Sequence, residues 1–320
     1  MILKKFINKN HFYILLLFIF SITINNHYAN LGAFPVDTFL HFDIGYKILE
    51  GLIPFTDVWM VSGATVNYIQ ALFFYILGIN WASYVLHASI MNCVITIGTY
   101  FLLKNFKINN NHCFIYSIFF SILAYPSSGT PFVDHHSTFF SLMGFYSLLL
   151  AIKNDKKIFW ILIPIFLGFA FLSKQVPASY IIFSIIIVVA FYSFVSKKIE
   201  YIKYILIGCL IFISSIFVFG SLAGIKLENF IEQYILYPST IGQSRLDNLN
   251  ITFQSLVLHF KFIHLSILPI LIINLKKIIY SKGYIKEKKF FYFISILFFT
   301  SCLIFHQLLT KNQTFIFFII

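Results

Sequence analysis

The chain has 320 residues, of which 59% are hydrophobic and 11% are charged. A water-soluble domain carries roughly 25% charged residues because its surface must be hydrated, so this composition excludes an ordinary soluble protein. The net charge of +12 does not indicate nucleic-acid binding, because the lysines lie in short clusters between apolar runs. The composition therefore predicts an integral membrane protein.

The first predicted element is a membrane span. Lys4, Lys5 and Lys9 precede an apolar stretch from 11 to 24 that no cleavage site follows, so we expect an uncleaved span with a cytoplasmic N-terminus. Further spans are expected where apolar runs are bounded on one side by lysine clusters, because such loops stay in the cytoplasm. The nine predicted spans lie at about 10–27, 81–103, 112–125, 137–152, 158–173, 176–196, 204–224, 260–275 and 290–306. Residues 314–320 begin another span, and we expect the chain to continue beyond them.

The fold class that follows is an all-α, polytopic transmembrane helix bundle, with residues 1–320 forming a single transmembrane domain. The outer loop 28–80 contains apolar-rich stretches at 38–50 and 66–78, which predict helices lying along the membrane interface. Most acidic residues gather on this outer side, although acids contribute little to orientation. Their position therefore indicates a function on the outer face. The exceptions among the 11 acids are Asp155, Glu200 and Glu287.

The first candidate site lies early in that loop. Asp37 and His41 are four residues apart and would share a face on a helix. A carboxylate near the membrane surface can act as a general base toward an acceptor hydroxyl. The alternative is that Asp37 caps a helix beginning near Thr38. The residues alone leave both readings open.

A second group lies at the start of a predicted span, where Asp134, His135 and His136 follow one another. Polar groups at that depth are costly and usually face a cavity or a partner. A divalent metal such as Mg or Mn is one option, with Asp37, Asp134 and His135 as candidate ligands. The other option is that these side chains orient a sugar or a phosphate by hydrogen bonds, so no cofactor is assigned.

Cationic side chains form the third group on the outer side. Lys174 lies in a tight hairpin, FLSKQVPASY, where a lone ammonium is poorly solvated. A lipid phosphate would compensate this charge, whereas the alternative is a lysine that snorkels to the headgroups. Arg245 and an expected loop with His306 and Lys311 add further cationic groups on the same side.

In their order along the chain these features resemble the GT-C superfamily of membrane glycosyltransferases, in particular the bacterial branch related to protein mannosyltransferases and aminoarabinose transferases. The segment DTFLHFDIGYKILEGLIPFTDVW, followed by NYIQALFFYILG, is similar to the first outer loop of that branch. GFAFLSKQ is similar to its lysine-bearing hairpin. The resemblance implies a GT-C-like bundle in the bacterial inner membrane with its active site on the periplasmic face.

The same resemblance implies the chemistry and the partners. A hexosyl or pentosyl group would pass, with inversion, from a polyprenyl-phosphate carrier to a lipid, glycan or protein acceptor of the cell envelope. Carried over by position, Asp37 is the general base, Asp134 is a second catalytic residue that helps organise the acceptor or a metal, and Lys174 contacts the donor phosphate. Arg245, as a further cation on the outer side, is expected to bind that phosphate too. The supporting residues are His41, Asp43, His135 and His136.

One departure from the family pattern concerns the residue after the proposed base. Relatives often carry Asp-Glu where this chain has Asp37 and Thr38, so the role of that glutamate is either missing or taken by Asp43.

Two other functions stay open: a secondary transporter or lipid flippase, and a relative without activity. Transporters place charged residues near the midplane of broken helices. The acids here gather in outer loops instead, which favours an enzyme.

Overall fold

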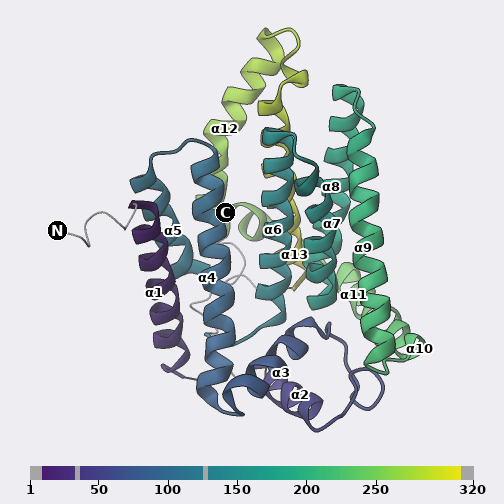
Figure 1. The fold of residues 1–320 in the computed structure, drawn as a ribbon. Coiled ribbons are helices and arrows are strands. Elements are labelled where there is room, and N and C mark those ends of the chain that lie inside the picture. The colour runs from purple at the N-terminus through teal and green to yellow at the C-terminus, as the bar shows by residue number, and fades with distance from the viewer. Residues whose placement is uncertain (1–8, 33–36, 125–128, 311–320) are drawn as a thin grey trace, which may run out of the picture.

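The computed structural model describes residues 9–32, 37–124 and 129–310 (Figure 1). Within these residues every regular element is a helix, and the one β-type contact is an isolated bridge between Pro54 and Val58. The predicted all-α fold is therefore confirmed. The start of the expected span at 314–320 lies outside the described residues.

Nine long helices in the described part of the chain coincide with the nine predicted spans. They are α1 (Lys9–Ala29), α4 (Trp81–Asn105), α5 (Asn110–Ala124), α6 (Val133–Asn154), α7 (Lys157–Ser173), α8 (Gln175–Ser196), α9 (Glu200–Leu222), α12 (Lys261–Tyr280) and α13 (Lys288–Thr310). Six of them, α1, α4, α8, α9, α12 and α13, are long and apolar enough to cross a membrane. The helices α5 and α7 are shorter, and α6 carries many polar residues. A multi-pass membrane protein follows, while the count of nine spans stays a prediction.

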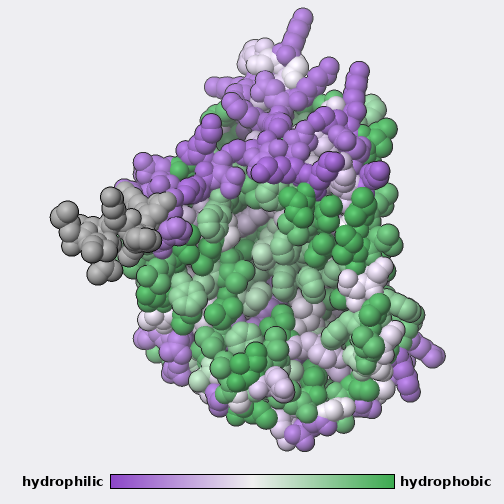
Figure 2. Space-filling model, viewed as in Figure 1, coloured by the Kyte–Doolittle hydropathy of each residue, from purple (hydrophilic) through white to green (hydrophobic). Residues whose placement is uncertain are grey.

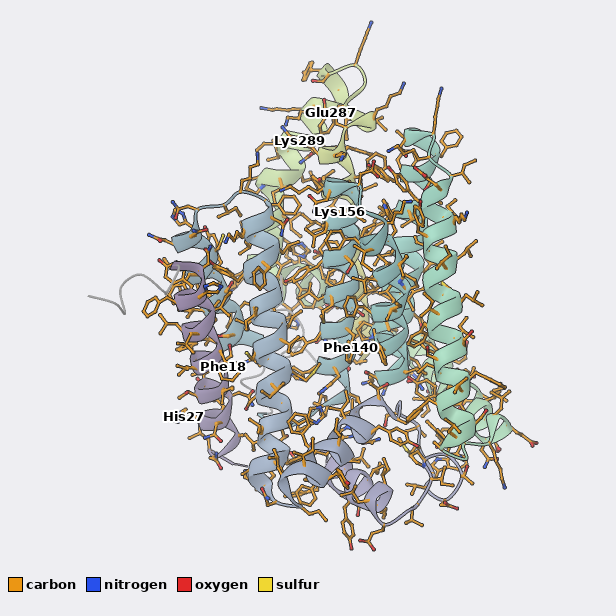
Figure 3. The ribbon with its side chains drawn as sticks, in the orientation of Figure 1. Phe18, His27, Phe140, Lys156, Glu287 and Lys289 are labelled. Atoms are coloured by element: carbon orange, nitrogen blue, oxygen red, sulfur yellow. The ribbon has the colours of Figure 1, made fainter. Side chains whose placement is uncertain are left out.

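The two ends of the bundle differ in character. Figure 2 shows a strongly hydrophilic surface at one end and an apolar belt below it. Lys156, Glu287 and Lys289 lie at the hydrophilic end, and His27 lies toward the other (Figure 3). The short helices α2 (Leu40–Leu49), α3 (Thr65–Leu77) and α10 (Leu227–Phe230) lie at that opposite end (Figure 1). The lysine-rich loops and the first long loop are thus on opposite sides of the apolar belt.

The two helices expected in the first loop are present. α2 has 10 residues and α3 has 13, whereas a membrane span needs about 20. α2 begins at Leu40 rather than near Thr38, its N-cap position is Phe39, and no side chain caps it. Asp37 contributes only its main-chain oxygen, which accepts from the Leu40 amide at 3.3 Å. Side-chain capping of α2 by Asp37 is therefore absent.

The apolar core lies around α6, which packs against α4, α7, α8 and α13. Phe139 and Leu148 of α6, Trp160 of α7, Ile181 of α8 and Leu303 of α13 are all buried there. By contrast, α9 and α12 leave most of their apolar side chains exposed, as expected of helices that face lipid. The polar first turn of α6 is therefore held by a well-packed group of four helices.

The first loop is fixed to the turn between α7 and α8. The Gly63 amide donates to the Ser173 carbonyl at 3.0 Å, and Gln175 Nε2 donates to the Val61 carbonyl at 3.0 Å. A Cβ atom at Gly63 would overlap the carbonyl of Leu172, so only glycine fits this close approach. The loop thereby lies directly against the segment that carries Lys174.

A second clamp joins the loop to the π-helical turn Ile231–Leu236, which leads into α11 (Tyr237–Asp247). The Gln233 side chain accepts from the Met60 amide at 2.9 Å and donates to the Phe55 carbonyl at 2.8 Å. Gln175 also donates to the Tyr234 carbonyl at 2.7 Å. Two buried or half-buried amides therefore fix the loop, the hairpin and this turn relative to one another.

Candidate active site

A buried carboxylate with two side-chain partners, a lysine and a histidine, lies at the start of α6. Asp134 is 3% exposed. Its Oδ2 lies 2.6 Å from Lys174 Nζ, and its Oδ1 lies 3.2 Å from His306 Nε2. Removing a carboxylate from water costs several kcal/mol unless partners compensate it. The contacts join α6, the α7–α8 turn and α13 around one charge.

Lys174 is positioned by the shortness of its turn. α7 ends at Ser173 and α8 begins at Gln175, so Lys174 is a single extended residue between two helices. Ser137 Oγ donates to its carbonyl oxygen at 3.2 Å. Ser137 and Asp134 are three residues apart on α6 and share a face. One face of α6 therefore holds both the backbone and the ammonium of Lys174, whose side chain remains 24% exposed.

His306 corrects one expectation from the sequence. It was expected in an outer loop with Lys311, but α13 continues to Thr310 and buries His306 to 1% exposure. The helix continues because the two leucines after Gln307 extend its apolar pattern. Lys311 lies outside the described residues. His306 is thus a buried partner of Asp134 rather than a surface cation.

Asp37 is exposed in the turn before α2, and His41 lies one turn further on and is 1% exposed. His41 Nδ1 lies 2.8 Å from Asn67 Oδ1 of α3. Burial lowers the pKa of His41, while the hydrogen bond to Asn67 and the charges of Asp37 and Asp134 oppose this and Lys174 adds to it. His41 therefore lies within electrostatic range of the carboxylates of both proposed catalytic residues.

Asp43 lies apart from this group. Its carboxylate pairs with Lys47 at 2.7 Å, one turn along α2, and its side chain is 53% exposed. Exposed pairs of this kind contribute little to stability. With its charge directed to solvent, Asp43 has no contact with Asp134.

His135 and His136 are both buried in the first turn of α6. His136 Nδ1 lies 3.0 Å from the Phe132 carbonyl, so it donates there, and its Nε2 is left to accept from His87 Nε2 at 2.9 Å. His87, on α4, lies in turn 2.9 Å through Nδ1 from the side-chain amide of Gln70 of α3; since Nε2 is the donor, Nδ1 accepts, and the amide turns its nitrogen toward it. A buried polar chain therefore connects α3, α4 and α6.

Asn67, Gln70 and His87 belong to no motif that singles them out in the sequence. Asn67 and Gln70 are three apart on α3, where they hold His41 of α2 and His87 of α4 respectively. Two features of the sequence could have indicated these residues. Asn67 and Gln70 are amides at helical spacing in an apolar stretch, and His87 is a histidine early in a predicted span. Their partners depend on how the helices pack.

The proposed metal ligands do not fit a metal ion well. Both carboxylate oxygens of Asp134 are bonded by Lys174 and His306. Throughout the described ranges, no three His, Cys, Asp or Glu side chains are grouped so that they could share an ion. The arrangement of Asp37, Asp134 and His135 therefore carries no further argument for a metal.

Arg245 lies on α11 and is exposed at the edge of a polar cavity of about 560 Å³ that also reaches Gln307. It is within electrostatic range of His306. No direct contact joins Arg245 to Lys174 among the described interactions. Arg245 thus approaches the Asp134 cluster from the side of α11.

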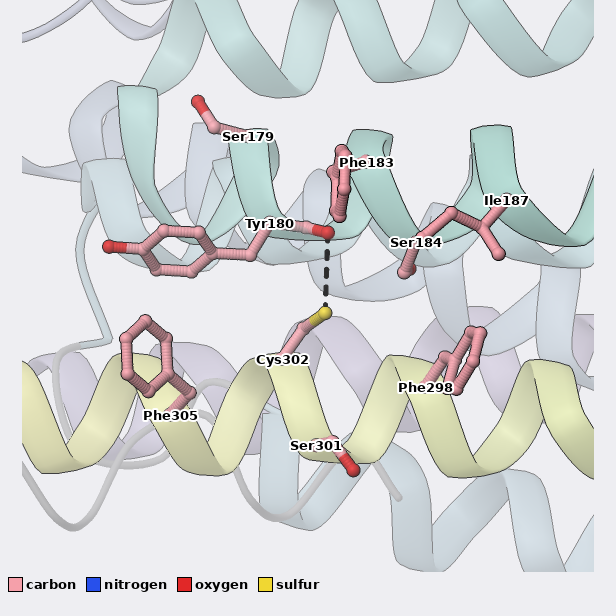
Figure 4. Close-up of a pocket in the computed structure, with 9 residues that line it drawn as sticks. All are labelled: Ser179, Tyr180, Phe183, Ser184, Ile187, Phe298, Ser301, Cys302 and Phe305. Carbon is pink, nitrogen blue, oxygen red and sulfur yellow. Dashed lines mark hydrogen bonds between the residues drawn. The ribbon is translucent and has the colours of Figure 1, made fainter.

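An apolar groove of about 370 Å³ runs between α8 and α13 (Figure 4). Cys302 Sγ points across it to the Tyr180 carbonyl at 3.3 Å. Tyr180 and Phe305 lie at one end of the groove, and Ile187 and Phe298 lie at the other (Figure 4). Lys174 directly precedes α8, and His306 directly follows Phe305. The Tyr180 end of the groove therefore adjoins the Asp134 cluster.

Comparison with known proteins gives one family. The sequence model of the dolichyl-phosphate-mannose-protein mannosyltransferase family matches residues 63–218, a segment that contains Asp134 and Lys174. This match is consistent with a GT-C superfamily glycosyltransferase, so the resemblance seen in the sequence is confirmed over that segment. No curated protein and no solved structure matched the chain.

Proposed function

Taking residues 63–218 as a GT-C glycosyltransferase segment, we propose that the chain transfers a sugar from a polyprenyl-phosphate carrier to an acceptor hydroxyl at the end of the bundle that carries α2 and α3. The observation that carries this proposal is the buried cluster of Asp134, Lys174 and His306 beside an apolar groove. A charged group next to a lipid-sized groove matches a donor that is a phosphate on an apolar chain.

The proposed reaction is a single displacement that inverts the anomeric carbon. The acceptor oxygen forms a bond to that carbon, and the bond from the carbon to the phosphate oxygen breaks with its electron pair passing to the phosphate. Asp37 takes the proton of the acceptor hydroxyl, because an exposed carboxylate at the edge of the site can reach an incoming acceptor. The leaving phosphate gains negative charge, which cations placed in advance stabilise.

Lys174 is suited to bind that phosphate without giving up Asp134. An ammonium has three N–H donors, and one bond to Asp134 leaves two for phosphate oxygens. Because Asp134 is also bonded by His306, it orients Lys174 as a fixed charge rather than as a loose side chain. Arg245 supplies the second cation from the side of α11. In this role Asp134 is a positioning residue for the donor site.

The groove between α8 and α13 is the proposed place of the lipid chain. Its described lining is almost wholly apolar, and both helices are candidate membrane spans. A chain running along it from the Lys174 end would lie between two candidate membrane spans. The donor would then lie with its phosphate at the membrane surface and its tail in the bilayer.

The proposed orientation places the lysine-rich loops in the cytoplasm, following the positive-inside rule. The end with α2 and α3 then faces outward, which in a bacterial inner membrane is the periplasm. The proposed acceptor is a lipid, a glycan or a protein of the cell envelope.

The test uses the purified full-length chain in liposomes, with a radiolabelled polyprenyl-phosphate sugar and extracted envelope acceptors. We expect labelled acceptor to form together with free polyprenyl phosphate, and Lys174→Ala to reduce this by weakening donor binding. Gln243→Leu, on the exposed side of α11, serves as the control. Movement of the labelled lipid across the bilayer without any sugar transfer would instead identify a transporter.

A further inference from the structure

The polar cavity beside Arg245 has the features of a small-molecule subsite. It lies between α11, the segment 248–260 and the C-terminal end of α13. Its volume of about 560 Å³ falls within the range of roughly 300–1,000 Å³ typical of ligand sites. Gln307 and Phe260 are its buried residues, and Ser244, Asn248 and Asn250 line it from exposed positions.

Gln307 is the most specific feature of this cavity. Its side chain belongs to a residue that is only 1% exposed, and its Oε1 has no hydrogen-bond partner among the described residues. A buried acceptor without a donor is unfavourable, and a ligand hydroxyl would satisfy it. Gln307 therefore contributes an unsatisfied polar group to the wall of the cavity.

The cavity also adjoins the proposed donor site. Gln307 follows His306, which contacts Asp134. Arg245 lines the cavity and lies within electrostatic range of both His306 and Tyr180, a residue of the apolar groove. A donor with its chain in the groove and its phosphate near Arg245 would thus direct its sugar into the cavity.

The charges of the lining restrict which sugar fits. Arg245 is the one ionisable side chain among the described lining residues, and none of these is a carboxylate. Amides and hydroxyls pair well with neutral hydroxyl groups, whereas an ammonium group would be repelled by the nearby guanidinium. The lining therefore favours an uncharged sugar over an amino sugar.

We propose that this cavity is the sugar-selecting subsite, in which Gln307 accepts a hydrogen bond from a hydroxyl of an uncharged sugar. The inference rests on the proposed function, because it assumes a polyprenyl-phosphate donor. It adds the place where the sugar lies, the residue that recognises it and the class of sugar that is accepted.

The experiment measures binding to the full-length protein of three probes: polyprenyl phosphate, a polyprenyl-phosphate hexose and a polyprenyl-phosphate amino sugar. The wild type should bind the hexose donor more tightly than the amino-sugar donor. Gln307→Leu should weaken the binding of the hexose donor by about three- to tenfold, the range expected for the loss of one neutral hydrogen bond. The binding of polyprenyl phosphate should stay unchanged. Gln307→Glu adds a carboxylate and should shift the preference toward the amino sugar.

The matched control is Gln243→Leu, because Gln243 lies on α11 outside the cavity lining and pairs with Asp247 at 2.9 Å. Its binding of all three probes should equal that of the wild type. If both Gln307 variants keep the wild-type ratio between the two sugar donors while polyprenyl phosphate binds, the sugar subsite is refuted and the proposed function stands. If polyprenyl phosphate itself fails to bind the wild type, the proposed function and the subsite both fail.

Discussion

Lys174 Nζ lies 2.6 Å from Asp134 Oδ2, and this ion pair joins residues forty positions apart at the end of the bundle that carries α2 and α3. The carboxylate is almost fully buried, while the lysine keeps a quarter of its side chain exposed. Because of this difference in exposure, solvent and ligands are excluded from the carboxylate but can reach the lysine. A phosphate can therefore reach the ammonium while Asp134 remains paired.

The energy of this pair can be measured by a double-mutant cycle. Lys174→Met should lower the free energy of unfolding by about 2 kcal/mol, because Asp134 is left buried with His306 alone. Adding Asp134→Asn should restore part of that loss, since the remaining charge is removed. Denaturation in detergent provides the values. The exposed pair is the control, and Lys47→Met should change stability by less than about 0.5 kcal/mol. Equal effects of the two lysine substitutions would contradict a buried pair.

The close approach of the first loop to the α7–α8 turn predicts the effect of Gly63→Ala. The added methyl group would overlap the carbonyl of Leu172, so the loop must shift, at a cost of about 1–3 kcal/mol. Because the same loop lies against the Lys174 turn, donor binding should weaken as well. Gly98→Ala in α4 is the matched control, since its new Cβ has no atom within 4 Å, and it should be neutral or slightly stabilising. A Gly63→Ala protein with wild-type melting and binding would refute this contact.

The burial of His41 predicts a pH dependence of stability. Burial lowers the pKa of His41 below its ordinary value of 6.5, so the unfolded chain takes up this proton more readily than the folded one. The stabilisation is therefore present above about pH 6.5 and is lost as the pH falls below it. Melting temperatures of wild type and His41→Gln between about pH 7.5 and pH 5 should show a flatter profile in the variant. His27→Gln, at an exposed position on α1, should keep the wild-type profile.

The arrangement of the two ends predicts opposite labelling of two loops. Glu50→Cys lies at an exposed position just after α2, and Ser281→Cys lies at an exposed position just after α12. With the lysine-rich loops in the cytoplasm, a membrane-impermeant maleimide should label the cysteine at 50 but not the one at 281 in intact cells. Labelling at 281 alone would reverse the topology and move the candidate site to the cytoplasmic face.

Much of the fold could be predicted from the sequence because its signals are local. Long apolar runs and lysine clusters located the nine helices, and the apolar-rich stretches 38–50 and 66–78 located α2 and α3. The resemblance singled out Asp134 and Lys174 separately, Asp134 as a catalytic residue and Lys174 as a ligand of the donor phosphate. Their distance from each other could not be read from the sequence, because it depends on how α6 packs against the α7–α8 turn.

The hydrogen-bond partners of the buried histidines could not be predicted from local sequence patterns. His306 meets Asp134 across 172 residues, and His136 meets His87 across 49. No periodicity in a single sequence specifies which residues of two packed helices face each other. The expectation that His306 lay in a loop was wrong for a related reason. A histidine near the end of an apolar run is typical of the exposed end of a helix. His306 is buried instead because it contacts the carboxylate of Asp134, a partner that the sequence does not reveal.

The central claim, that this site transfers a sugar with Asp37 as the base, is tested most directly by the turnover of Asp37→Asn. Asparagine keeps the size of the side chain but cannot take up the acceptor proton, so the rate of sugar transfer should fall by about 10²–10⁴-fold while donor binding survives. Asp57→Asn is the control, because Asp57 accepts from the Ile53 amide at 2.8 Å and an amide oxygen can replace it. The account predicts collapse of turnover in the first variant and near wild-type transfer in the second. Full sugar transfer by a folded Asp37→Asn protein would contradict the proposed mechanism.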